Sequence, residues 1–366
     1  MGAASKVIHA VGKLILLGTL NDDDYTGDES KKSFRRPRQL FQWFDHRDVE
    51  SWEESRFKKV RALMDAPRNY GRVYLMMDTH TKELVAVKKM PTKWVGKNHS
   101  EFVAAHPEET ELPWQDFGCT RYLASMGYSA LLHLRGVYRD KKFTYAVSDL
   151  ATGGDLCSWC DPATTIPCIE VEVAFRPLAI QICRVVRDLH NLGIVHRDLS
   201  LENFLLCETG AAQPHSPTDG LEVKVIDFAM ASLQRWNKDR VAGKLCYLAP
   251  EVHTSKTECD GFLRDAFAVG VTLFAMLRRE YPWESAQPGA SITFELFQRR
   301  GLQAILRRRN DPSHGSMSEP LLALLDGLLN PEPSMRLTLG ETEYGSGRRS
   351  VWDEPWIRDG PFAANV

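Results

Sequence analysis

"VHRDLSLENFLL", residues 195–206, is a charged triplet followed by an asparagine and a run of apolar residues. This pattern predicts a loop that leads into a buried strand. In such a loop, Asp198 can accept a hydroxyl proton or orient a nucleophile. The carbonyl oxygen of Asn203 can bind a hard cation. The stretch therefore indicates a catalytic loop.

Two further stretches supply matching chemistry. In "LVAVK", residues 84–88, side chains alternate across a strand, so Ala86 and Lys88 share one face and could hold a flat base and a phosphate. This motif alone is weak, because a lysine near a strand end is more often solvated. In "VKVIDFA", residues 223–229, an apolar strand carries Asp227 at its end, where a carboxylate can hold Mg²⁺. One lysine, two aspartates and one asparagine in this order are the parts that phosphoryl transfer needs.

The bulk composition is that of a globular protein with two lobes or domains. The chain has 366 residues, 43% of them hydrophobic and 26% charged, and a domain usually holds about 100–200 residues. The formal net charge of -2 gives no global field that would favour nucleic acid or an anionic membrane. No apolar run approaches the roughly 18 residues of a membrane helix. We therefore expect no nucleic-acid partner and no membrane partner.

The eight cysteines are dispersed, and several lie inside apolar runs. This usage is typical of a reducing compartment, so we expect a cytoplasmic protein, with the nucleus as the alternative. Cys157 and Cys160 form the only Cys-x-x-Cys, and a zinc site would need a second such pair or a matching histidine pair. We therefore expect no structural zinc, and we expect a monomer.

Changes in composition divide the chain into an extension, two lobes and a tail. Residues 1–55 are acidic, then basic, and poor in core residues, so we expect a mobile extension. Its basic run is interpreted as a solvated linker, with a nuclear signal or a docking site as alternatives. Strand patterns dominate residues 56–150 and helical patterns residues 151–357, followed by a tail at 358–366. The predicted fold class is α+β.

Two helices stand out in the second lobe. Apolar residues recur with helical spacing from Leu178 to Leu189, and Pro177 either begins or kinks that helix. The stretch at residues 265–279 is apolar nearly all round, which is typical of a helix buried on all sides.

The motifs resemble those of the eukaryotic protein kinases, and the resemblance extends over residues 57–357. In chain order, the matching motifs are "VAVK" of the third strand, "HRDLSLEN" of the catalytic loop, "DFA" where the family has DFG, "APE", "DAFAVG" of the buried F helix with Asp265 as its anchoring acid, and "PSMRLT". Any one of them would be a weak signal, whereas their common order is a strong one. The resemblance also implies that Arg336 pairs with Glu251.

The resemblance implies a bilobal kinase fold, with an antiparallel sheet in the small lobe, and a Ser/Thr kinase similar to the CAMK and AGC groups. Such a protein transfers the γ-phosphate of Mg-ATP to a protein substrate, with Asp198 as the base and Lys88 on the phosphates. Asn203 and Asp227 would hold Mg²⁺. The residues implied to bind ATP are Arg68, Gly71, Val73, Ala86, Lys88, Asp116, Ser148, Asp149, Ala151 and Asp155.

"APRNYGRV", residues 66–73, stands where the family has its glycine-rich phosphate loop. Ala66 and Arg68 replace the first two glycines, and only Gly71 remains. Glycines let backbone N–H groups approach phosphate closely, so their loss is expected to weaken ATP binding. A direct contact between the Arg68 guanidinium and phosphate could restore it. The alternative is that Arg68 points into solvent.

Helix C and the DFA motif also depart from the family. The acid that pairs with Lys88 aligns best with Asp116, and Glu111 is the second candidate. Aspartate is one methylene shorter than the family's glutamate, so we expect a longer pair. Ala229 replaces the DFG glycine, and because alanine disfavours positive φ we expect a restricted flip of this segment.

Ser200 stands where Ser/Thr kinases have a catalytic-loop lysine, and Lys244, in "GKLCYLAPE", stands where they have a threonine. The two residue types are exchanged between loops that meet at the active site in this fold. We therefore expect the Lys244 ammonium to hydrogen-bond Ser200 and Asp198 and to stabilise the developing negative charge, which makes Lys244 a catalytic candidate. The alternative is two independent losses.

Substrate choice and activation are open to two hypotheses. Glu202 and Asp155 match acidic positions that meet arginines upstream of the target hydroxyl in basophilic relatives, so a basic substrate is one hypothesis. The alternative is that Asp155 contacts only the ATP ribose and Glu202 only the large lobe.

The activation segment contains only Ser232 and Tyr247 as hydroxyl residues. The family's usual regulatory Ser or Thr is therefore absent from this segment. The hypothesis for activation is that the negative charge of Asp239 permanently replaces the regulatory phosphate.

The four side chains with direct roles in the family's chemistry, Lys88, Asp198, Asn203 and Asp227, are all present. The sequence therefore favours an active kinase. A pseudokinase scaffold, with or without ATP, is the alternative, and a nucleotide-regulated binding module is the third hypothesis.

Overall fold

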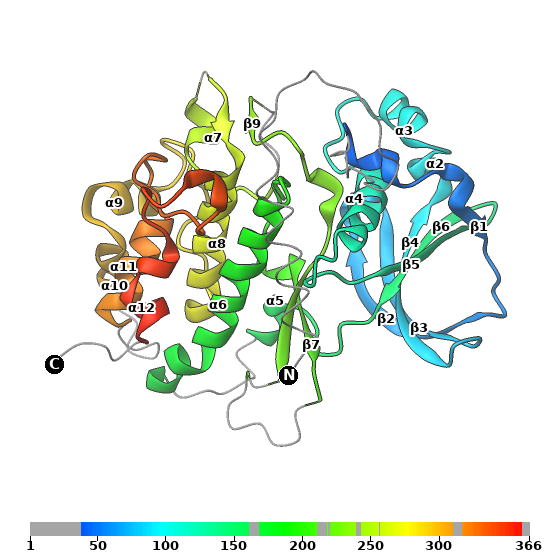
Figure 1. Ribbon diagram of the computed structural model, residues 1–366, viewed down its shortest axis with the longest axis horizontal. Helices are drawn as coiled ribbons and strands as arrows, with labels where there is room; N and C mark the ends of the chain where they lie inside the picture. The colour runs from blue at the N-terminus through cyan, green and yellow to red at the C-terminus, as the bar shows by residue number, and fades with distance from the viewer. Residues whose placement is uncertain are drawn as a thin grey trace, which may run out of the picture. The chain divides into compact units, whose positions relative to one another are not determined.

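A six-stranded sheet forms the small lobe in the described part of the computed structural model (Figure 1). The structure describes residues 38–160, 168–210, 218, 220–238, 243–255, 257–309 and 317–360, which belong to the compact unit Pro37–Val366. The strands are β1 (Val49–Ser51), β2 (Phe57–Ala66), β3 (Gly71–Asp78), β4 (Glu83–Pro91), β5 (Leu134–Arg139) and β6 (Phe143–Asp149). Their order across the sheet is β1-β5-β6-β4-β3-β2.

The strands β2 to β6 pair antiparallel, as predicted. Side chains alternate along β4 as the sequence pattern requires, with Val85 and Val87 fully buried in the core beneath the sheet. Ala86 and Lys88 therefore share the opposite face. The register places Ala86 beside Ser148, so residues from β4 and β6 meet at one place on that face.

The small lobe begins before the predicted boundary at residue 56. Strand β1 pairs in parallel with β5, and two 3₁₀ helices, η1 (Leu40–Trp43) and η2 (His46–Asp48), precede it. Leu40 and Phe44 are buried. The prediction of a mobile extension up to residue 55 is therefore wrong for residues 38–55, because a few apolar side chains dock this polar stretch onto the lobe. The basic run, apart from Arg38, lies outside the described residues.

Three helices, α2 (Thr92–Val95), α3 (His99–Ala105) and α4 (Pro113–Ser125), pack beside the sheet. Helix α4 has a proline at its start, where the missing N–H costs no hydrogen bond. Trp114 and Phe117 on α4 pack with Phe44 and Phe102 in one buried cluster. This packing fixes α4 at the edge of the sheet that faces the large lobe.

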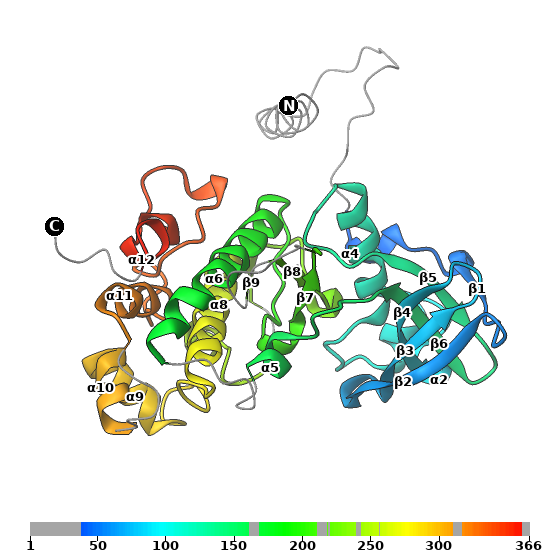
Figure 2. The same cartoon turned by 90° about the horizontal axis from the view of Figure 1, so that it is seen from below.

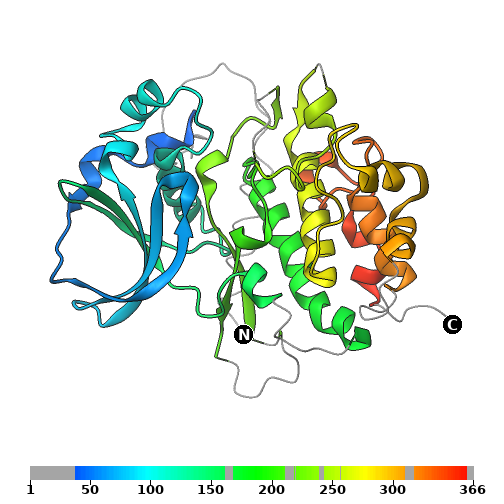
Figure 3. The same ribbon diagram turned by 180° about the vertical axis from the view of Figure 1, so that it is seen from behind.

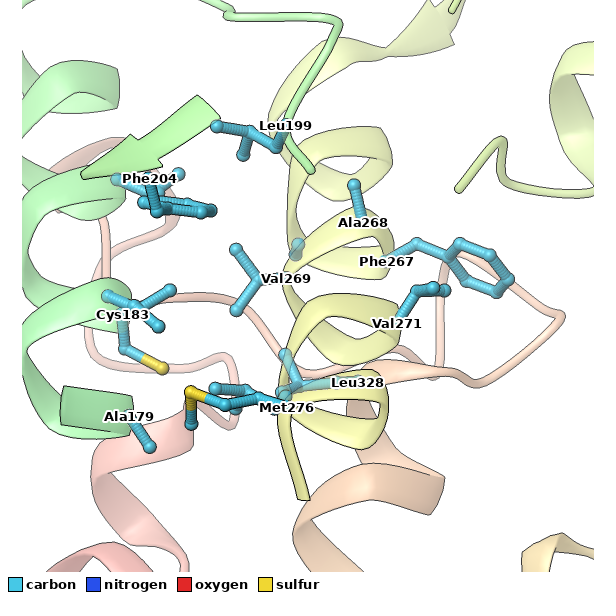
Figure 4. Close-up of a cluster of buried hydrophobic side chains, with 14 of the residues drawn as sticks. Ala179, Cys183, Leu199, Phe204, Phe267, Ala268, Val269, Val271, Met276 and Leu328 are labelled. Atoms are coloured by element: carbon cyan, nitrogen blue, oxygen red, sulfur yellow. The ribbon is translucent and has the colours of Figure 1, made fainter. Parts of the chain in front are cut away.

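Helices dominate the large lobe, and α6 (Cys168–Asn191) and α8 (Gly261–Arg278) form its centre. Helix α8 is buried along nearly its whole length, as predicted. Figure 4 shows Cys183 of α6, Val269 and Met276 of α8, and Leu328 in one cluster of apolar side chains. Pro177 lies inside α6 and does not begin it. The other helices are α5 (Leu156–Trp159), α7 (Glu251–Thr254), α9 (Ile292–Arg300), α10 (Leu302–Arg309), α11 (Glu319–Leu328) and α12 (Pro355–Arg358), with the 3₁₀ helices η7 (Thr342–Tyr344) and η8 (Val351–Asp353).

An antiparallel pair of strands, β7 (Phe204–Glu208) and β8 (Leu221–Val225), lies on the side of α6 that faces the small lobe (Figures 1 and 2). The 3₁₀ helices η4 (Leu201–Asn203) and η5 (Phe228–Met230) flank it. A short pair, β9 (Trp236–Asn237) and β10 (Cys259–Asp260), follows. Figure 3 shows from behind that the helices of the last third of the chain belong to the large lobe. The bilobal α+β architecture is therefore confirmed.

None of the helices in the described part of the chain combines the length and the apolar character that crossing a bilayer demands.

Candidate active site

A cavity of about 680 Å³ lies between the two lobes. The predicted site residues that line it are Arg68, Val73, Ala86, Lys88, Asp116, Ser148, Asp149, Ala151, Asp155, Asp198, Asn203, Asp227 and Lys244. They come from the 3₁₀ helix η3 (Pro67–Asn69), β3, β4, α4, the end of β6 and the segment that follows it, the catalytic loop and the segments after β8. The fold therefore brings together stretches that lie far apart in the sequence.

Gly71 has a different role from the one predicted. It is the first residue of β3 and is not among the described residues that line the cavity. A Cβ atom at this position would lie 2.5 Å from the carbonyl oxygen of Lys89 on the neighbouring strand. Gly71 is therefore required for the close approach of β3 to β4, and the geometry does not support it as an ATP ligand.

Hydrogen bonds to its backbone hold the catalytic loop. The side-chain nitrogen of Asn203 donates to the carbonyl oxygen of Asp198 at 2.7 Å. The Asp265 carboxylate accepts from the N–H of His196 at 2.6 Å and of Arg197 at 2.9 Å. Arg197 has a φ of 73°, a left-handed conformation that costs an L-residue about 1–2 kcal/mol. Asp265 offsets this cost, as its predicted anchoring role requires.

A buried histidine supports Asp265 from behind. His190 Nε2 lies 3.1 Å from Asp265, and His190 Nδ1 lies 2.7 Å from Glu341. Burial lowers the pKa of His190, but hydrogen bonds to the two carboxylates outweigh burial and raise it to about 9. The predicted ion pair between Arg336 and Glu251 is also present, at 2.7 Å. Charged groups paired inside the large lobe thus fix the loop's position.

The Asp198 carboxylate has an unusual acidity. Burial raises its pKa to about 6, and Asp227 acts in the same direction, whereas the charges of Arg68 and Lys244 lower it. A carboxylate with a pKa near 6 is largely ionised at neutral pH and is a better proton acceptor than an ordinary aspartate. This acidity suits a general base.

Lys88, Asp116 and Asp227 form a buried charged cluster. Burial opposes the charge of Lys88, but Asp227 and Asp116 together raise the Lys88 pKa above its usual value. Burial and the charge of Asp227 raise the pKa of Asp116 to about 6, while Lys88 lowers it. Among the described residues, Lys88 makes no ion pair within 4.0 Å, which agrees with the longer pair predicted. Asp116 is therefore the better of the two candidate partners for Lys88.

The segment after Asp227 lies against the start of α4. Asp227 has a φ of 66°, and Ala229 lies within η5 without a positive φ. The N–H of Phe228 donates to Asp116 at 2.9 Å, and the N–H of Leu112 donates to the Ala229 carbonyl oxygen at 3.2 Å. Alanine therefore suits the conformation in this structure, and the predicted restriction of a flip stays a prediction.

Lys244 reaches the catalytic loop. Its ammonium donates to Ser200 Oγ at 2.8 Å and to Glu202 Oε2 at 2.7 Å. The first of these is the contact that the exchange of residue types predicts. The expected hydrogen bond to Asp198 is absent among the described residues, and Glu202 takes its place. Although burial dominates the Asp198 pKa, the charge of Lys244 is close enough to lower it.

The two acids predicted to meet substrate arginines already have partners. Burial would raise the Glu202 pKa, but the hydrogen bond from Lys244 lowers it below its usual range. Asp155 caps α5, accepting from the N–H of Ser158 at 2.7 Å and from its hydroxyl at 2.9 Å. An incoming arginine would have to compete with these contacts.

Arg68 turns into the cavity from the 3₁₀ helix η3 (Pro67–Asn69). Its Nη1 donates to Glu111 at 2.9 Å and lies 3.4 Å from Asp198 Oδ2. Asn69 donates to the same Glu111 at 2.5 Å. The alternative, that Arg68 points into solvent, is not what the structure shows, because the guanidinium contacts two acids. Sequence reasoning missed the pairing of Glu111 with this loop, because no local pattern links residues so far apart in the chain.

Two of the residues implied to bind ATP, Ser148 and Asp149, lie at the end of β6 in the cavity wall. Ser148 lies beside Ala86, and the N–H of Asp149 donates to the His133 carbonyl oxygen at 3.1 Å. In the activation segment, the buried Tyr247 hydroxyl accepts from the N–H of Leu201 at 3.2 Å. Asp239, the predicted substitute for a regulatory phosphate, lies outside the described residues.

Comparisons with known proteins agree with this geometry. A family model described as the protein kinase domain matches residues 69–356. The serine/threonine-protein kinase SAPK3 of Oryza sativa subsp. indica is 28% identical over 290 residues, which cover 79% of this chain and 76% of that protein. The testis-specific serine/threonine-protein kinase 5 of Mus musculus is 29% identical over 222 residues, or 59% of this chain and 53% of that protein. The CDPK-related kinase 5 of Arabidopsis thaliana is 30% identical over 246 residues, or 64% of this chain and 35% of that protein.

Proposed function

This chain belongs to the protein kinase family and is of the Ser/Thr type, and on that premise we propose that it transfers the γ-phosphate of Mg-ATP to a protein serine or threonine hydroxyl. The observation that carries the proposal is the convergence of Lys88, Asp198, Asn203 and Asp227 on one cavity. A cation for the phosphates, a base and oxygen ligands for a metal are the parts that this reaction needs.

The donor set fits Mg²⁺. Asn203 uses its side-chain nitrogen on the backbone of Asp198, which leaves its amide oxygen for a cation. Asp227 contributes a carboxylate to the same cavity. Mg²⁺ prefers oxygen and takes one or two carboxylates when substrate phosphates complete its coordination. When bound, the ion would supply neutralisation of phosphate charge.

The catalytic loop would prepare the substrate for transfer. Asp198 would orient the incoming hydroxyl and accept its proton, which the raised pKa favours. Lys244, held by Ser200 at 2.8 Å, would present its positive charge to the developing negative charge. The charge would then come from a different loop than in relatives that carry a lysine at the position of Ser200.

Arg68 would replace the lost backbone donors of the phosphate loop. A guanidinium presents a planar set of donors that matches phosphate oxygens. In this structure the guanidinium already lies in the cavity, 3.4 Å from Asp198. We propose that it leaves Glu111 and Asp198 to contact the phosphates when ATP binds.

A basic residue upstream of the target hydroxyl is a further proposal for the substrate. It rests on the carboxylates of Glu202 and Asp155 beside the cavity. Because Lys244 already neutralises Glu202 at 2.7 Å, Asp155 would have to provide most of the preference. A peptide library measured with full-length protein tests this, and equal rates with and without upstream arginine would reject it.

The phosphate loop favours one rival, a pseudokinase scaffold that binds ATP weakly or not at all. Two glycines are missing, and Arg68 contacts the carboxylate that would act as the base. A scaffold would keep its partners without phosphotransfer. A nucleotide-regulated module would bind ATP but need no base.

Phosphotransfer by the full-length chain distinguishes these functions. Asp198→Asn removes the base and should reduce transfer from Mg-ATP by about 10³-fold. It should not lower the melting temperature, because burial raises the Asp198 pKa in the fold and ionisation therefore costs stability above pH 6.

Asp359→Asn, at the exposed residue that follows α12, is the matched control and should leave the rate unchanged. Absence of transfer by the unmodified chain, with ATP binding that depends on Lys88, would favour the nucleotide-regulated module. Absence of both transfer and ATP binding would favour the scaffold.

A further inference from the structure

The segment at residues 40–48 lies against α4 and falls outside the range that the kinase family model matches. Leu40 is 0% exposed and Phe44 is 4% exposed, so the segment is docked and not merely adjacent. It contacts the helix that carries Asp116. This docking could simply bury apolar surface, or it could also position the helix.

The backbone of the segment touches the backbone of the helix at Gly118. A Cβ atom on Gly118 would lie 2.2 Å from the Leu40 carbonyl oxygen and 2.6 Å from the Phe41 Cα. Both are backbone atoms, so neither can rotate away. Glycine is among the least favourable residues inside a helix, and this close approach gives it a physical reason here.

Side chains fix the segment along α4. The Phe44 ring packs 5.4 Å from the ring of Phe117, and the Trp43 ring packs 5.1 Å from that of Tyr122. Arg121 on the helix pairs with Asp48 at the far end of the segment. The contacts thus extend over more than one helical turn, which resists rotation of the helix as well as translation.

One side chain on α4 joins this segment to the DFA segment. Gln115 Oε1 accepts from the N–H of Phe41 at 3.2 Å, and Gln115 Nε2 donates to the Ala231 carbonyl oxygen at 2.8 Å. The next residue, Asp116, accepts from the N–H of Phe228 at 2.9 Å. Residues 40–48, the start of α4 and residues 228–231 are therefore connected by hydrogen bonds in series.

We propose that residues 40–48 form an intramolecular clamp that positions α4 for catalysis, with Gln115 as the positioning residue. The clamp holds Asp116 where it acts on Lys88 and on the segment that follows Asp227. In this way a stretch outside the matched kinase range sets the geometry of the charged cluster. The catalytic part of this inference rests on the proposed function, whereas the mechanical part does not.

Two substitutions in the full-length chain test the clamp from its two sides. Gly118→Ala should push residues 40–48 off the helix although alanine favours helix formation. Gln115→Leu should break the connection to Ala231 while keeping a side chain of similar size. Ala124→Ser, on the exposed side of the same helix, adds one atom away from the segment and serves as the control.

The mechanical readout is hydrogen–deuterium exchange of peptides covering residues 113–125 and 228–238. Both variants should exchange faster in both regions, and Ala124→Ser should match the unmodified chain. Unchanged exchange at residues 228–238 in Gln115→Leu would overturn the proposal. If Gly118→Ala does not fold, Gln115→Leu decides the question alone.

The catalytic readout is the split between kcat and KM. Each variant should lower kcat about tenfold and change the KM for ATP less than about twofold, because positioning acts on the transfer step. The double variant should be no slower than the slower single variant, since both interrupt one connection. Multiplied losses would overturn the proposal. If the unmodified chain transfers no phosphate, the proposed function fails, and exchange still tests the clamp.

Discussion

The catalytic loop and the phosphate loop border the same cavity, yet they depart from the family pattern in different ways. At the catalytic loop, Ser200 lacks the family's lysine, and Lys244 reaches it from another loop at 2.8 Å. At the phosphate loop, two glycines are gone, and Arg68 reaches Glu111 and Asp198 instead.

The difference shows which functions can move between loops. A side-chain charge can be supplied from any loop that reaches the same point in space. The N–H groups of a glycine-rich turn belong to the backbone itself, and another loop cannot supply them without a similar path. The departure at the catalytic loop is therefore interpreted as an exchange of residue types between two loops. The departure at the phosphate loop replaces backbone donors with a side chain as the means of binding phosphate.

Of the two loops, the catalytic loop with its exchanged pair is expected to show the larger effect. Lys244→Thr and Ser200→Lys should each reduce phosphotransfer about 10²-fold. The first removes the positive charge from the catalytic loop, and the second places another ammonium against that of Lys244. The double variant restores the arrangement of relatives and should recover most of the rate. The measurement is steady-state phosphotransfer by all four proteins, and losses that simply multiply would contradict the exchange.

A smaller effect is expected at the phosphate loop. Arg68→Ala should weaken ATP binding about tenfold, which corresponds to about 1.4 kcal/mol for one charged contact. Adenosine has no phosphates, so its affinity should not change. Calorimetric titration of the full-length chain with both ligands measures the difference. Tighter ATP binding by Arg68→Ala would instead show that Arg68 blocks the cavity.

The smallest effect links the two regions through Asp198. Burial raises the Asp198 pKa to about 6, while Arg68 and Lys244 hold it down, in that order. Because the base must be ionised, kcat/KM should fall as the pH drops, to about half its plateau near pH 6. Arg68→Ala should move this fall to higher pH, and Lys244→Met should move it less. A pH profile of kcat/KM for the three proteins measures both shifts, and equal or reversed shifts would contradict this account.

Much of the fold could be predicted because its signals are local. The alternation of residues 84–88 predicts which face of β4 carries Lys88, and that face is observed. The apolar stretch at residues 265–279 predicts a buried helix, and α8 is buried. The spacing of apolar residues is visible in a short window of sequence, so it predicts a strand or a helix without knowledge of what packs against it.

Other features could not be predicted because their partners are distant. Residues 38–55 have a polar composition, and only the docking of Leu40 and Phe44 shows that they belong to the lobe. The role of Gly71 depends on a carbonyl oxygen of the neighbouring strand. The pairing of Glu202 with Lys244 depends on how two loops meet. None of these has a signature in the residues nearby.

The sequence by itself determined the chemical groups, their order along the chain and the architecture that carries them. The tertiary structure alone decided their partners: Glu202 for Lys244, Glu111 and Asp198 for Arg68, and α4 for residues 40–48. The physical reason is that a hydrogen bond or an ion pair forms only when its two groups lie within a fraction of an ångström of the right distance. Its strength also depends on how deeply the two groups are buried. Those quantities are set by the packing of remote segments and not by the residues that form the bond.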